Sequence, residues 1–371
     1  MSWRWMWVLM VVMPSAWAQR PPETHPVSSS QNIVMSWDRS SIPTEIELWA
    51  PRTLLGYDYI NPGSNYGALH LVCASDSDAT NGRCPTDGNP ALLIGLHSIQ
   101  LTFVERRSNL RTEIALKGAV QRAMSGRSCL VDFWQSAIYA PWSSYGANCA
   151  SDVPSGTGVQ LGVSRDELAK LVAGVWSAKL ELHLQTPTRR SIATYSFNFE
   201  LTITDHNAVS IYFPAFPNVS PLVALNAGYD PISRTIGGRT VLDMCLYDGL
   251  GSQAQYLGVT VRDTGTRPPG PSGFSLWHDT AGNDDSQHLD YTVTLDHNGT
   301  TVPLTNGVEE QLHGIDTAQL RLVMLPGMSQ PVFCVPTPMT LDIPRVPVST
   351  KRSGIYWGDL KVELRVPTAT P

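Results

Sequence analysis

The chain has 371 residues, of which 16% are charged, and its formal net charge is -6 at pH 7. This negative balance argues against a nucleic-acid-binding protein, because such proteins usually present a strongly basic face or stripe. At ~100 to 200 residues per domain, the length predicts two domains.

The first residues have the pattern of an export signal. Arg4 gives a positive start, residues 5–13 form an apolar core, and Ala16-Trp17-Ala18 provides a small-residue cleavage site. We therefore expect residues 1–18 to be removed, so that the mature chain begins near Gln19. The apolar run is shorter than the ~20 residues that a membrane-spanning helix needs.

Short strands dominate the predicted secondary structure. Apolar and polar residues alternate from Leu180 to Leu184 and from Tyr195 to Ile203, which is the pattern of strands with one buried face. Similar alternation occurs at 289–295, 320–325 and 360–366. Because 29 glycines and 28 prolines are spread between such runs, the sequence favours an all-β fold made of two sandwich domains in tandem.

One short helix is predicted between these strands. Ser164 is placed to act as its N-cap, with Glu167 completing a capping box ahead of the apolar residues Leu168 and Leu171. No other segment has a helical pattern strong enough to support a prediction.

A polar turn cluster marks the expected domain boundary. Asp205-His206-Asn207 separates the strand that ends at Thr204 from the next apolar segment, 209–213. We therefore divide the chain into a signal peptide (1–18), a first domain (19–205) and a second domain (206–371).

Six cysteines follow the export signal, and an even number in an oxidising compartment predicts three disulfides. Their order suggests the simplest pairing, although the sequence allows many others. A metal site is the alternative, but the sequence has no CxxC spacing and its thiols lie far apart. The sequential pairing joins Cys73 to Cys84, Cys129 to Cys149 and Cys245 to Cys334.

Several unrelated segments together resemble one family, the minor tip adhesins of class 5 (colonisation factor) fimbriae, also described as CblD-like pilus biogenesis initiators. The segments occur in the family's order across nearly the whole mature chain. The matching stretches are 71–73 with 81–85 (NGRCP), 103–108 (FVERRS) with 117–118, 174–176 (GVW), 242–249 (LDMCLYDG), 305–307 (TNG), 331–334 (PVFC) and 356–360 (YWGDL).

The resemblance implies an amino-terminal adhesin domain and a carboxy-terminal, immunoglobulin-like pilin domain that lacks one strand. It also implies a fimbrial tip protein that starts pilus assembly and is exported through the periplasm to the cell surface, with a disulfide pattern similar to the sequential one. The implied partners are a periplasmic chaperone, an outer-membrane usher, the donor strand of the major pilin subunit and a host glycan receptor, with no cofactor, no metal and no nucleic acid.

Two apolar strands of the second domain are candidates to flank the groove left by the missing strand. The alternative is that their side chains belong to an ordinary sandwich core. The candidate residues are Val209, Ile211 and Phe213 in the first strand, and Leu360, Val362, Leu364 and Val366 in the last.

The resemblance also identifies a candidate receptor site. Arg189-Arg190 matches the double arginine of the family's binding pole, and a guanidinium suits a carboxylate or sulfate because it donates two parallel hydrogen bonds. The alternative is a solvated turn after Pro187. The family's other binding arginine is replaced by Ala68, which leaves a changed receptor open, or a basic group relocated to Arg106 or Arg107.

Further candidates for the receptor site have structural alternatives. His70 lies near the first cysteine, where a strand histidine without a ligand role is the alternative. Exposed aromatic rings stack on sugar faces, but core packing is the alternative use of each ring between Cys129 and Cys149. These aromatic residues are Trp134, Tyr139, Trp142 and Tyr145.

Enzymatic and metal-binding motifs are missing from the sequence. It has no Gly-x-Ser-x-Gly elbow, no His-Glu-x-x-His and no phosphate-binding glycine loop. The acidic stretch 279–290 does not follow the spacing of a calcium loop. We therefore expect an adhesin and not an enzyme. The alternatives are an assembly initiator without receptor binding and, more remotely, an exported carbohydrate-processing enzyme.

Overall fold

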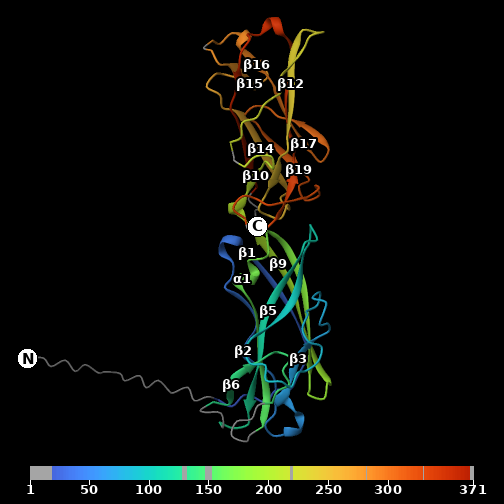
Figure 1. Ribbon diagram of the computed structural model, residues 1–371. Helices are drawn as coiled ribbons and strands as arrows, with labels where there is room; N and C mark the ends of the chain where they lie inside the picture. Colours follow the sequence, from blue (N-terminus) through green and yellow to red (C-terminus); the bar gives the residue numbers. More distant parts are fainter. Residues whose placement is uncertain are drawn as a thin grey trace, which may run out of the picture.

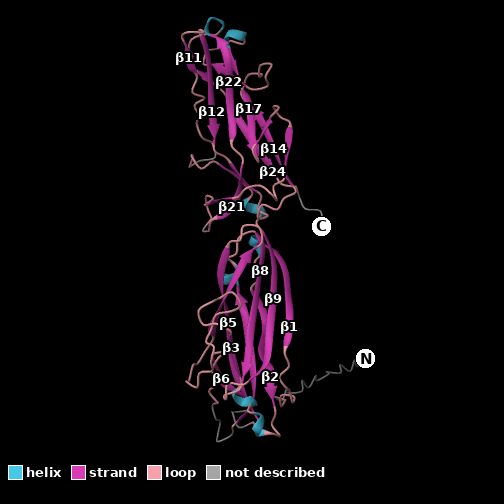
Figure 2. Cartoon of the chain, turned by 90° about the vertical axis from the view of Figure 1, so that its right-hand side faces the viewer, coloured by secondary structure: helices cyan, strands magenta, loops and turns pink. Residues whose placement is uncertain are grey.

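A computed structural model describes residues 19–127, 132–146, 153–217, 220–280, 282–328 and 330–367. They form an elongated molecule with two strand-rich bodies stacked end to end (Figures 1 and 2). The all-β prediction is confirmed. The predicted signal peptide and the predicted Cys129–Cys149 disulfide lie outside the described residues.

In the described part of the chain, one nine-stranded sheet makes up the first body. Its main path is β1-β9-β8-β4-β5-β7-β2, with β3 added beside β8 and β6 beside β5. Its strands are β1 (Ser29–Asp38), β2 (Glu45–Tyr57), β3 (His70–Cys73), β4 (His97–Glu105), β5 (Arg111–Met124), β6 (Trp134–Tyr139), β7 (Pro154–Ser164), β8 (Gly174–Gln185) and β9 (Ser191–Thr204).

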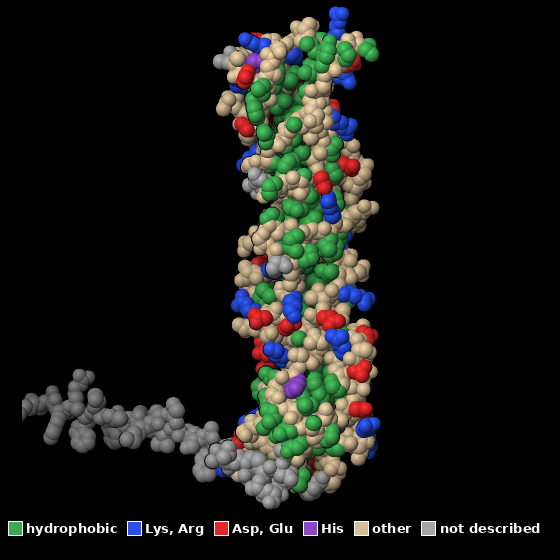
Figure 3. All heavy atoms as spheres, in the orientation of Figure 1, with side chains coloured by type: hydrophobic (Ala, Val, Ile, Leu, Met, Phe, Trp, Pro, Cys, Tyr) green, Lys and Arg blue, Asp and Glu red, His purple; other side chains and the backbone are tan. Residues whose placement is uncertain are grey.

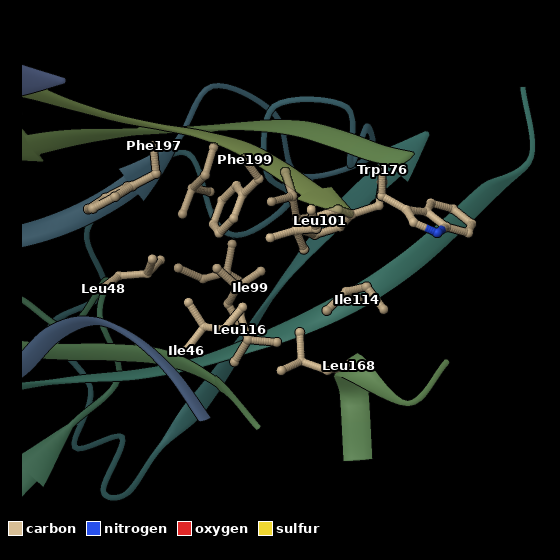
Figure 4. Packing of buried hydrophobic residues seen from close by; sticks show 14 of the residues in the cluster. Ile46, Leu48, Ile99, Leu101, Ile114, Leu116, Leu168, Trp176, Phe197 and Phe199 are labelled. Atoms are coloured by element: carbon tan, nitrogen blue, oxygen red, sulfur yellow. The ribbon is translucent and has the colours of Figure 1, made fainter. Parts of the chain in front are cut away.

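The alternating pattern of β9 explains how this sheet closes over a core. Tyr195, Phe197 and Phe199 are buried, whereas Ser196 and Asn198 between them are partly exposed. Trp49 of β2 meets Phe197 edge-on, with ring centroids 4.9 Å apart. Because β2 and β9 lie near opposite ends of the sheet path, this contact means that the sheet folds back on itself around one core. Figure 4 shows the packing of this core.

The short helix is present, but its predicted capping box is wrong. Helix α1 (Arg165–Leu168) begins after Ser164, whose side chain makes no capping hydrogen bond. Glu167 instead accepts the backbone N–H of Ala115 at 2.8 Å and pairs with Lys170. The carboxylate therefore ties the helix to β5. Within the described ranges, no helix has the length and apolar character needed to cross a bilayer.

The second body contains several smaller sheets. In the described residues their orders are β10-β13-β21-β20, β11-β12-β22-β17-β18, β19-β14-β24 and β16-β15-β23. The strands are β10 (Ser210–Tyr212), β11 (Gly228–Asp230), β12 (Thr235–Leu242), β13 (Cys245–Tyr247), β14 (Tyr256–Asp263), β15 (Ser275–His278), β16 (His288–Asp290), β17 (Thr292–His297), β18 (Thr300–Pro303), β19 (Glu309–His313), β20 (Arg321–Val323), β21 (Val332–Pro336), β22 (Met339–Pro347), β23 (Tyr356–Trp357) and β24 (Leu360–Arg365).

Short 3-10 helices connect these strands. Asp38 caps one of them by accepting the backbone N–H of Ser40, and Asp284 caps another through Ser286. The 3-10 helices are η1 (Arg39–Ser41), η2 (Pro62–Ser64), η3 (Tyr66–Ala68), η4 (His206–Ala208), η5 (Asp285–Gln287) and η6 (Val348–Thr350).

Two disulfides are formed within the described residues. One joins Cys73, the last residue of β3, to Cys84. The other joins Cys245 of β13 to Cys334 of β21, two strands that are hydrogen-bonded neighbours. The second bond closes a loop of 89 residues, against 11 for the first, so it restricts the unfolded chain more strongly.

The two bodies are attached to each other by polar contacts of the β4–β5 hairpin. The Arg107 guanidinium donates hydrogen bonds to the carbonyl oxygens of Ile315 and Ala318, at 2.7 and 2.8 Å, and to that of Asp316. The buried Glu105 carboxylate holds this hairpin by accepting the backbone N–H of Arg107 at 3.0 Å.

Apolar packing also continues across the junction. The core of the first body extends without a break into one end of the second, so the two bodies share one apolar cluster at the junction. The second-body members of this shared cluster are Cys245, Tyr247, Val323, Leu325, Val332 and Cys334.

Candidate functional site

Strand β24 forms one edge of its sheet. It pairs with β14 from Leu360↔Asp263 to Arg365↔Gly258, and its other edge has no strand partner among the described residues. The inward residues of β14 are fully buried, whereas Leu360, Val362 and Leu364 of β24 are only partly buried. Within the described ranges, the apolar side of this edge strand is therefore only partly covered.

A groove of about 1520 Å³ runs beside the open edge of β24. One wall is formed by β24 with residues 348 and 351–359, and the other by residues within 209–213 and 220–229. Met339, Leu341 and Ile343 of β22 line it from below. Figure 3 shows hydrophobic side chains gathered along this body. An unpaired strand edge and an apolar groove therefore lie side by side.

Ion pairs fix β24 on its paired side. Arg365 donates two hydrogen bonds to the Glu309 carboxylate of β19, and these bonds raise the pKa of Arg365 and lower that of Glu309. Glu363 pairs with Lys361 and with Arg262 of β14, at 2.7 and 3.1 Å. The charged side chains of Glu363 and Arg365 thus bind the neighbouring strands. The apolar side chains that alternate with them line the groove.

The turn between β8 and β9 carries the arginine pair at the distal pole, the end of the first body remote from the second (Figure 1). Arg189 has a φ of 62°, and the turn is closed by a hydrogen bond from its N–H to the Thr186 carbonyl at 2.9 Å. The Arg189 side chain is 73% exposed and lies 3.7 Å from the Asp87 carboxylate. Arg190 is exposed, and no described carboxylate lies within ion-pair distance of it.

His70 lies beneath this turn and is buried. Its register partner in β8 is Gln185, and its Nδ1 lies 3.1 Å from the Ala68 carbonyl oxygen. Gly88 packs against the ring so closely that a Cβ there would lie 2.2 Å from Nε2. Burial lowers the pKa of His70, so the ring is neutral at neutral pH and adds no charge to the pole.

The geometry can now be set beside known proteins. Family models for the first and second domains of the E subunit of the CFA/I fimbria (CfaE) match residues 14–206 and 209–368. The CFA/I fimbrial E subunit of Escherichia coli is 30% identical to the chain over 312 residues, which is 80% of each protein. The chain belongs to the CfaE family of fimbrial subunits.

Solved structures of this family share the fold. The crystal structure of CfaE, the adhesive subunit of the CFA/I fimbria of enterotoxigenic Escherichia coli, superposes with a TM-score of 0.70 at 26% identity, covering 94% of this chain and 95% of that one. A structure described in terms of a chaperone–tip adhesin complex in the biogenesis of CFA/I fimbriae gives 0.67 at 26% identity, covering 95% and 99%. These matches confirm the two-domain, all-β architecture and the predicted family resemblance.

The sequence analysis proposed a set of residues that flank a groove. Most of them line the cavity beside β24. Val366 packs against the same apolar cluster but does not line the cavity. Sequence reasoning missed Leu222–Leu225 and the residues of β22. The sequence of neither segment shows that it lies across the groove from β24. The lining residues among those proposed are Val209, Ile211, Phe213, Leu360, Val362 and Leu364.

Arg106 and Arg107, weighed as positions of a relocated binding group, both lie away from the distal pole. Arg107 is at the junction, with its guanidinium bonded to carbonyls of the second body. Arg106 pairs with Glu200 at 2.9 Å on the same end of the sheet. Both belong to a hairpin at the far end of the sheet from Arg189 and Arg190.

Most of the aromatic residues weighed as sugar platforms serve packing in this protein. Tyr139 is buried, with Tyr145 5.6 Å away between ring centroids. Trp142 meets His97 edge-on at 5.5 Å. Trp134 differs from these residues, because the guanidinium of Arg52 lies over its ring.

Sequence reasoning also missed Arg122, a fully buried cation beneath the pole. It donates to the carbonyls of Leu69, Tyr145 and Ser143 at 2.7, 2.9 and 2.5 Å, and to the Thr157 hydroxyl at 2.7 Å. Burial lowers its pKa to about 9, so it stays charged at neutral pH. The signal was its place between Val120 and Met124 on the inward face of an alternating strand. Arg122 thus joins the segments around Leu69, Ser143–Tyr145 and Thr157 to β5.

The described part of the acidic stretch contains a capped 3-10 turn, η5, followed by β16. Asp284 accepts hydrogen bonds from Ser286 and Gln287, and these bonds lower its pKa. Asp290 lies 2.8 Å from His288 Nδ1. In the described part of the chain, no group of three or more His, Cys, Asp or Glu side chains is arranged to hold a metal ion.

Proposed function

We propose that the chain is the adhesive tip subunit of a class 5 fimbrium, with an adhesin domain (19–205) and a pilin domain (206–371) that accepts a donor strand. The observation that carries this proposal is the groove beside the unpaired edge of β24. Membership of the CfaE family supports it, since CfaE is described as the adhesive subunit of its fimbria.

Strand addition suits the physical chemistry of this groove. An exposed strand edge promotes aggregation unless something covers it. An added strand forms main-chain hydrogen bonds with the edge, while its alternate side chains enter the apolar pockets. The partly buried Leu360, Val362 and Leu364 lie at a spacing of two residues, which matches the side chains of an extended partner.

The position at the tip follows from the chain order. Thr204, the last residue of β9, is followed directly by the linker and the pilin domain. The segment that precedes the pilin domain is therefore part of a folded sheet and not a free extension to donate. Such a protein accepts a strand from its neighbour, ends the fibre on its own side and starts assembly.

The partners of this function are those of chaperone-assisted export. A periplasmic chaperone fills the groove first, an outer-membrane usher receives the complex, and the major pilin's amino-terminal strand then replaces the chaperone. The solved chaperone–tip adhesin complex of the CFA/I fimbria supports the first step. The protein accordingly passes through the periplasm to the fimbrial tip at the cell surface. Its relatives are fimbrial adhesin subunits, and we propose no catalytic role.

The groove is tested by supplying or withholding a strand. Without its chaperone, the mature chain should aggregate in the periplasm. Fusion of an alternating apolar peptide to the carboxyl terminus should give a soluble monomer. The matched control is the same peptide with its inward residues changed to aspartate, which should fail because those charges would be buried unpaired. A stable monomer without any added strand would show that the groove needs no partner.

The receptor contact is assigned to Arg189 and Arg190, which bind a host glycan at the exposed pole. Their forked guanidinium groups, 73% exposed in the case of Arg189, suit a carboxylate or sulfate. Arg189→Ala/Arg190→Ala should abolish adhesion to host cells while fibres still assemble. Arg345→Ala, at a 64% exposed arginine of the second body, is the control.

The second candidate function is an assembly initiator that binds no receptor, which the presence of Ala68 at the family's other arginine position favours. The test is adhesion of wild-type fibres to host cells. If these fibres assemble normally but do not bind host cells, the second candidate function is supported.

A further inference from the structure

Most of the guanidinium–ring contacts in the described part of the chain gather near the distal pole, on the side formed by β2 and β6. We define the arginine–aromatic patch as Arg20, Arg52, Tyr59, Phe133 and Trp134. It is separate from the Arg189-Arg190 turn. β2 and β9 face each other across the core, as the contact of Trp49 with Phe197 demonstrates.

The backbone of β2 is distorted where it presents Arg52. The register between β2 and β7 shifts between Trp49 and Thr53, and Arg52 within that interval has a φ of 66°. Bulges re-aim side chains, and a non-glycine residue in the left-handed region persists only where its surroundings enforce it. Here the distortion brings the guanidinium carbon to 5.6 Å from the Trp134 ring centroid.

Strand β7 leaves room for this stack. A Cβ at Gly158 would lie 2.7 Å from atoms of the Trp134 ring and 3.1 Å from the Cα of Arg52. Both parts of the stack thus depend on the absence of a side chain at this position. The bulge and the glycine come from different strands and serve the same arrangement.

A second guanidinium contacts Phe133, the residue that precedes Trp134 in the chain. Arg20 lies over the Tyr59 ring at 4.3 Å and also 5.6 Å from the Phe133 ring centroid. Tyr59 is 39% exposed, whereas Phe133 is buried and forms the base. Aromatic faces hold a guanidinium flat and leave its N–H edge free to bind other groups.

The hydrogen-bonding capacity of these arginines is only partly used. Arg52 donates from Nη1 to Asp132 at 2.8 Å and from Nε to Gln121 at 3.4 Å. Within the described residues Nη2 of Arg52 has no partner, and Arg20 has neither a hydrogen bond nor a carboxylate within 4 Å. Among the described residues, Asp132 balances the charge of Arg52, and no carboxylate lies within ion-pair distance of Arg20.

We propose that the arginine–aromatic patch is a second ligand site, which binds the carboxylate or sulfate group of an acidic saccharide. The free guanidinium edges receive the oxyanion through charge-assisted hydrogen bonds, and the exposed part of the Tyr59 ring contacts the apolar face of the sugar. The saccharide part of this inference rests on the proposed adhesin function. The oxyanion part rests on the geometry of the patch alone.

The test uses the full mature chain, secreted with its chaperone, on an array of neutral saccharides and the same saccharides carrying sialic acid or sulfate esters. Arg20→Gln/Arg52→Gln should weaken binding to the anionic forms by about tenfold or more, since a charge-assisted hydrogen bond contributes about that factor. Arg321→Gln is the matched control, because it also removes an exposed pair, with Asp243 at 2.7 Å and no ring.

The outcomes separate this site from Arg189 and Arg190. Anionic binding that falls in Arg20→Gln/Arg52→Gln supports the patch, whatever Arg189→Ala/Arg190→Ala does. Binding that falls only in Arg189→Ala/Arg190→Ala overturns the patch and leaves the proposed function intact. Equal binding of neutral and anionic saccharides by the wild type also overturns it. The sialylated and sulfated arms show which oxyanion is preferred.

If the double variant does not fold, competition on the wild type decides. Inorganic sulfate and rising salt should both displace an anionic saccharide from arginines at the surface. Insensitivity of the bound saccharide to both would overturn the proposal.

Discussion

Replacing Arg122 with methionine tests how the distal pole is held together. The guanidinium is fully buried and satisfies the carbonyls of Leu69, Ser143 and Tyr145 as well as the Thr157 hydroxyl. Methionine fills similar space but donates nothing. Each buried carbonyl left without a donor costs about 1–3 kcal/mol.

An opposing effect reduces this loss. Arg122 has no carboxylate partner among the described residues, and burying a charge costs several kcal/mol, so its removal relieves a desolvation penalty. We therefore expect Arg122→Met to lower the free energy of unfolding of the first body by about 2–5 kcal/mol. Arg122→Lys should fall between methionine and the wild type, because an ammonium has only three donors, in a different geometry.

The measurement is differential scanning calorimetry of the strand-completed chain, following the transition of the first body. Arg106→Met is the control, because it removes a 61% exposed arginine from the same sheet and should change stability by less than ~1 kcal/mol. A similar small change in Arg122→Met, or a stabilisation, would mean that the buried charge costs as much as its hydrogen bonds contribute. The interpretation of Arg122 as the organiser of the pole would then be refuted.

Two further perturbations concern the junction. Arg107→Met removes the guanidinium that donates to three carbonyl oxygens of the second body, so hydrogen exchange of the amides in residues 315–318 should become faster. Arg106→Met is the control and should leave these exchange rates unchanged. Equal rates in the two variants would count against the contact. Burial raises the pKa of Asp38, but hydrogen bonds from Ser40, Thr204 and His206 outweigh this effect and hold the pKa well below 3.8. The ionised Asp38 therefore stabilises the folded chain above pH 3.8, and this stabilisation is lost as the pH falls below 3.8. Asp38→Asn should therefore flatten the loss of stability between pH 4 and pH 2 in acid titrations monitored by circular dichroism, and an unchanged slope would contradict this.

The sequence predicted strands best where a single alternating pattern coincides with a single sheet. β9 is one such strand, since its inward residues face one core along its whole length. The run from Leu289 to Leu295 has the same alternation but is divided at Tyr291, because β16 pairs with β15 whereas β17 pairs with β18 and β22. Alternation records which face is buried, not which strand lies beside it.

The same limit explains which parts of the groove were missed. The apolar positions of β24 were visible because they alternate with charged residues that bind the neighbouring strands. The floor from β22 and the arginine–aromatic patch depend on contacts between distant segments, such as Arg52 with Trp134 or Arg20 with Tyr59. Nothing within either segment alone records such a contact, so only the fold reveals it.

The arrangement of the two proposed binding regions would allow both to be occupied at once. The groove lies along the second body, whereas the β8–β9 turn that carries the arginine pair lies at the remote end of the first (Figure 1). β9 links them, because it begins after the Arg189-Arg190 turn and ends at Thr204 beside the linker. β1 and β8 are hydrogen-bonded along its length on either side. A load applied between a bound glycan and the fibre would therefore run along a continuously paired strand into the junction that Arg107 secures.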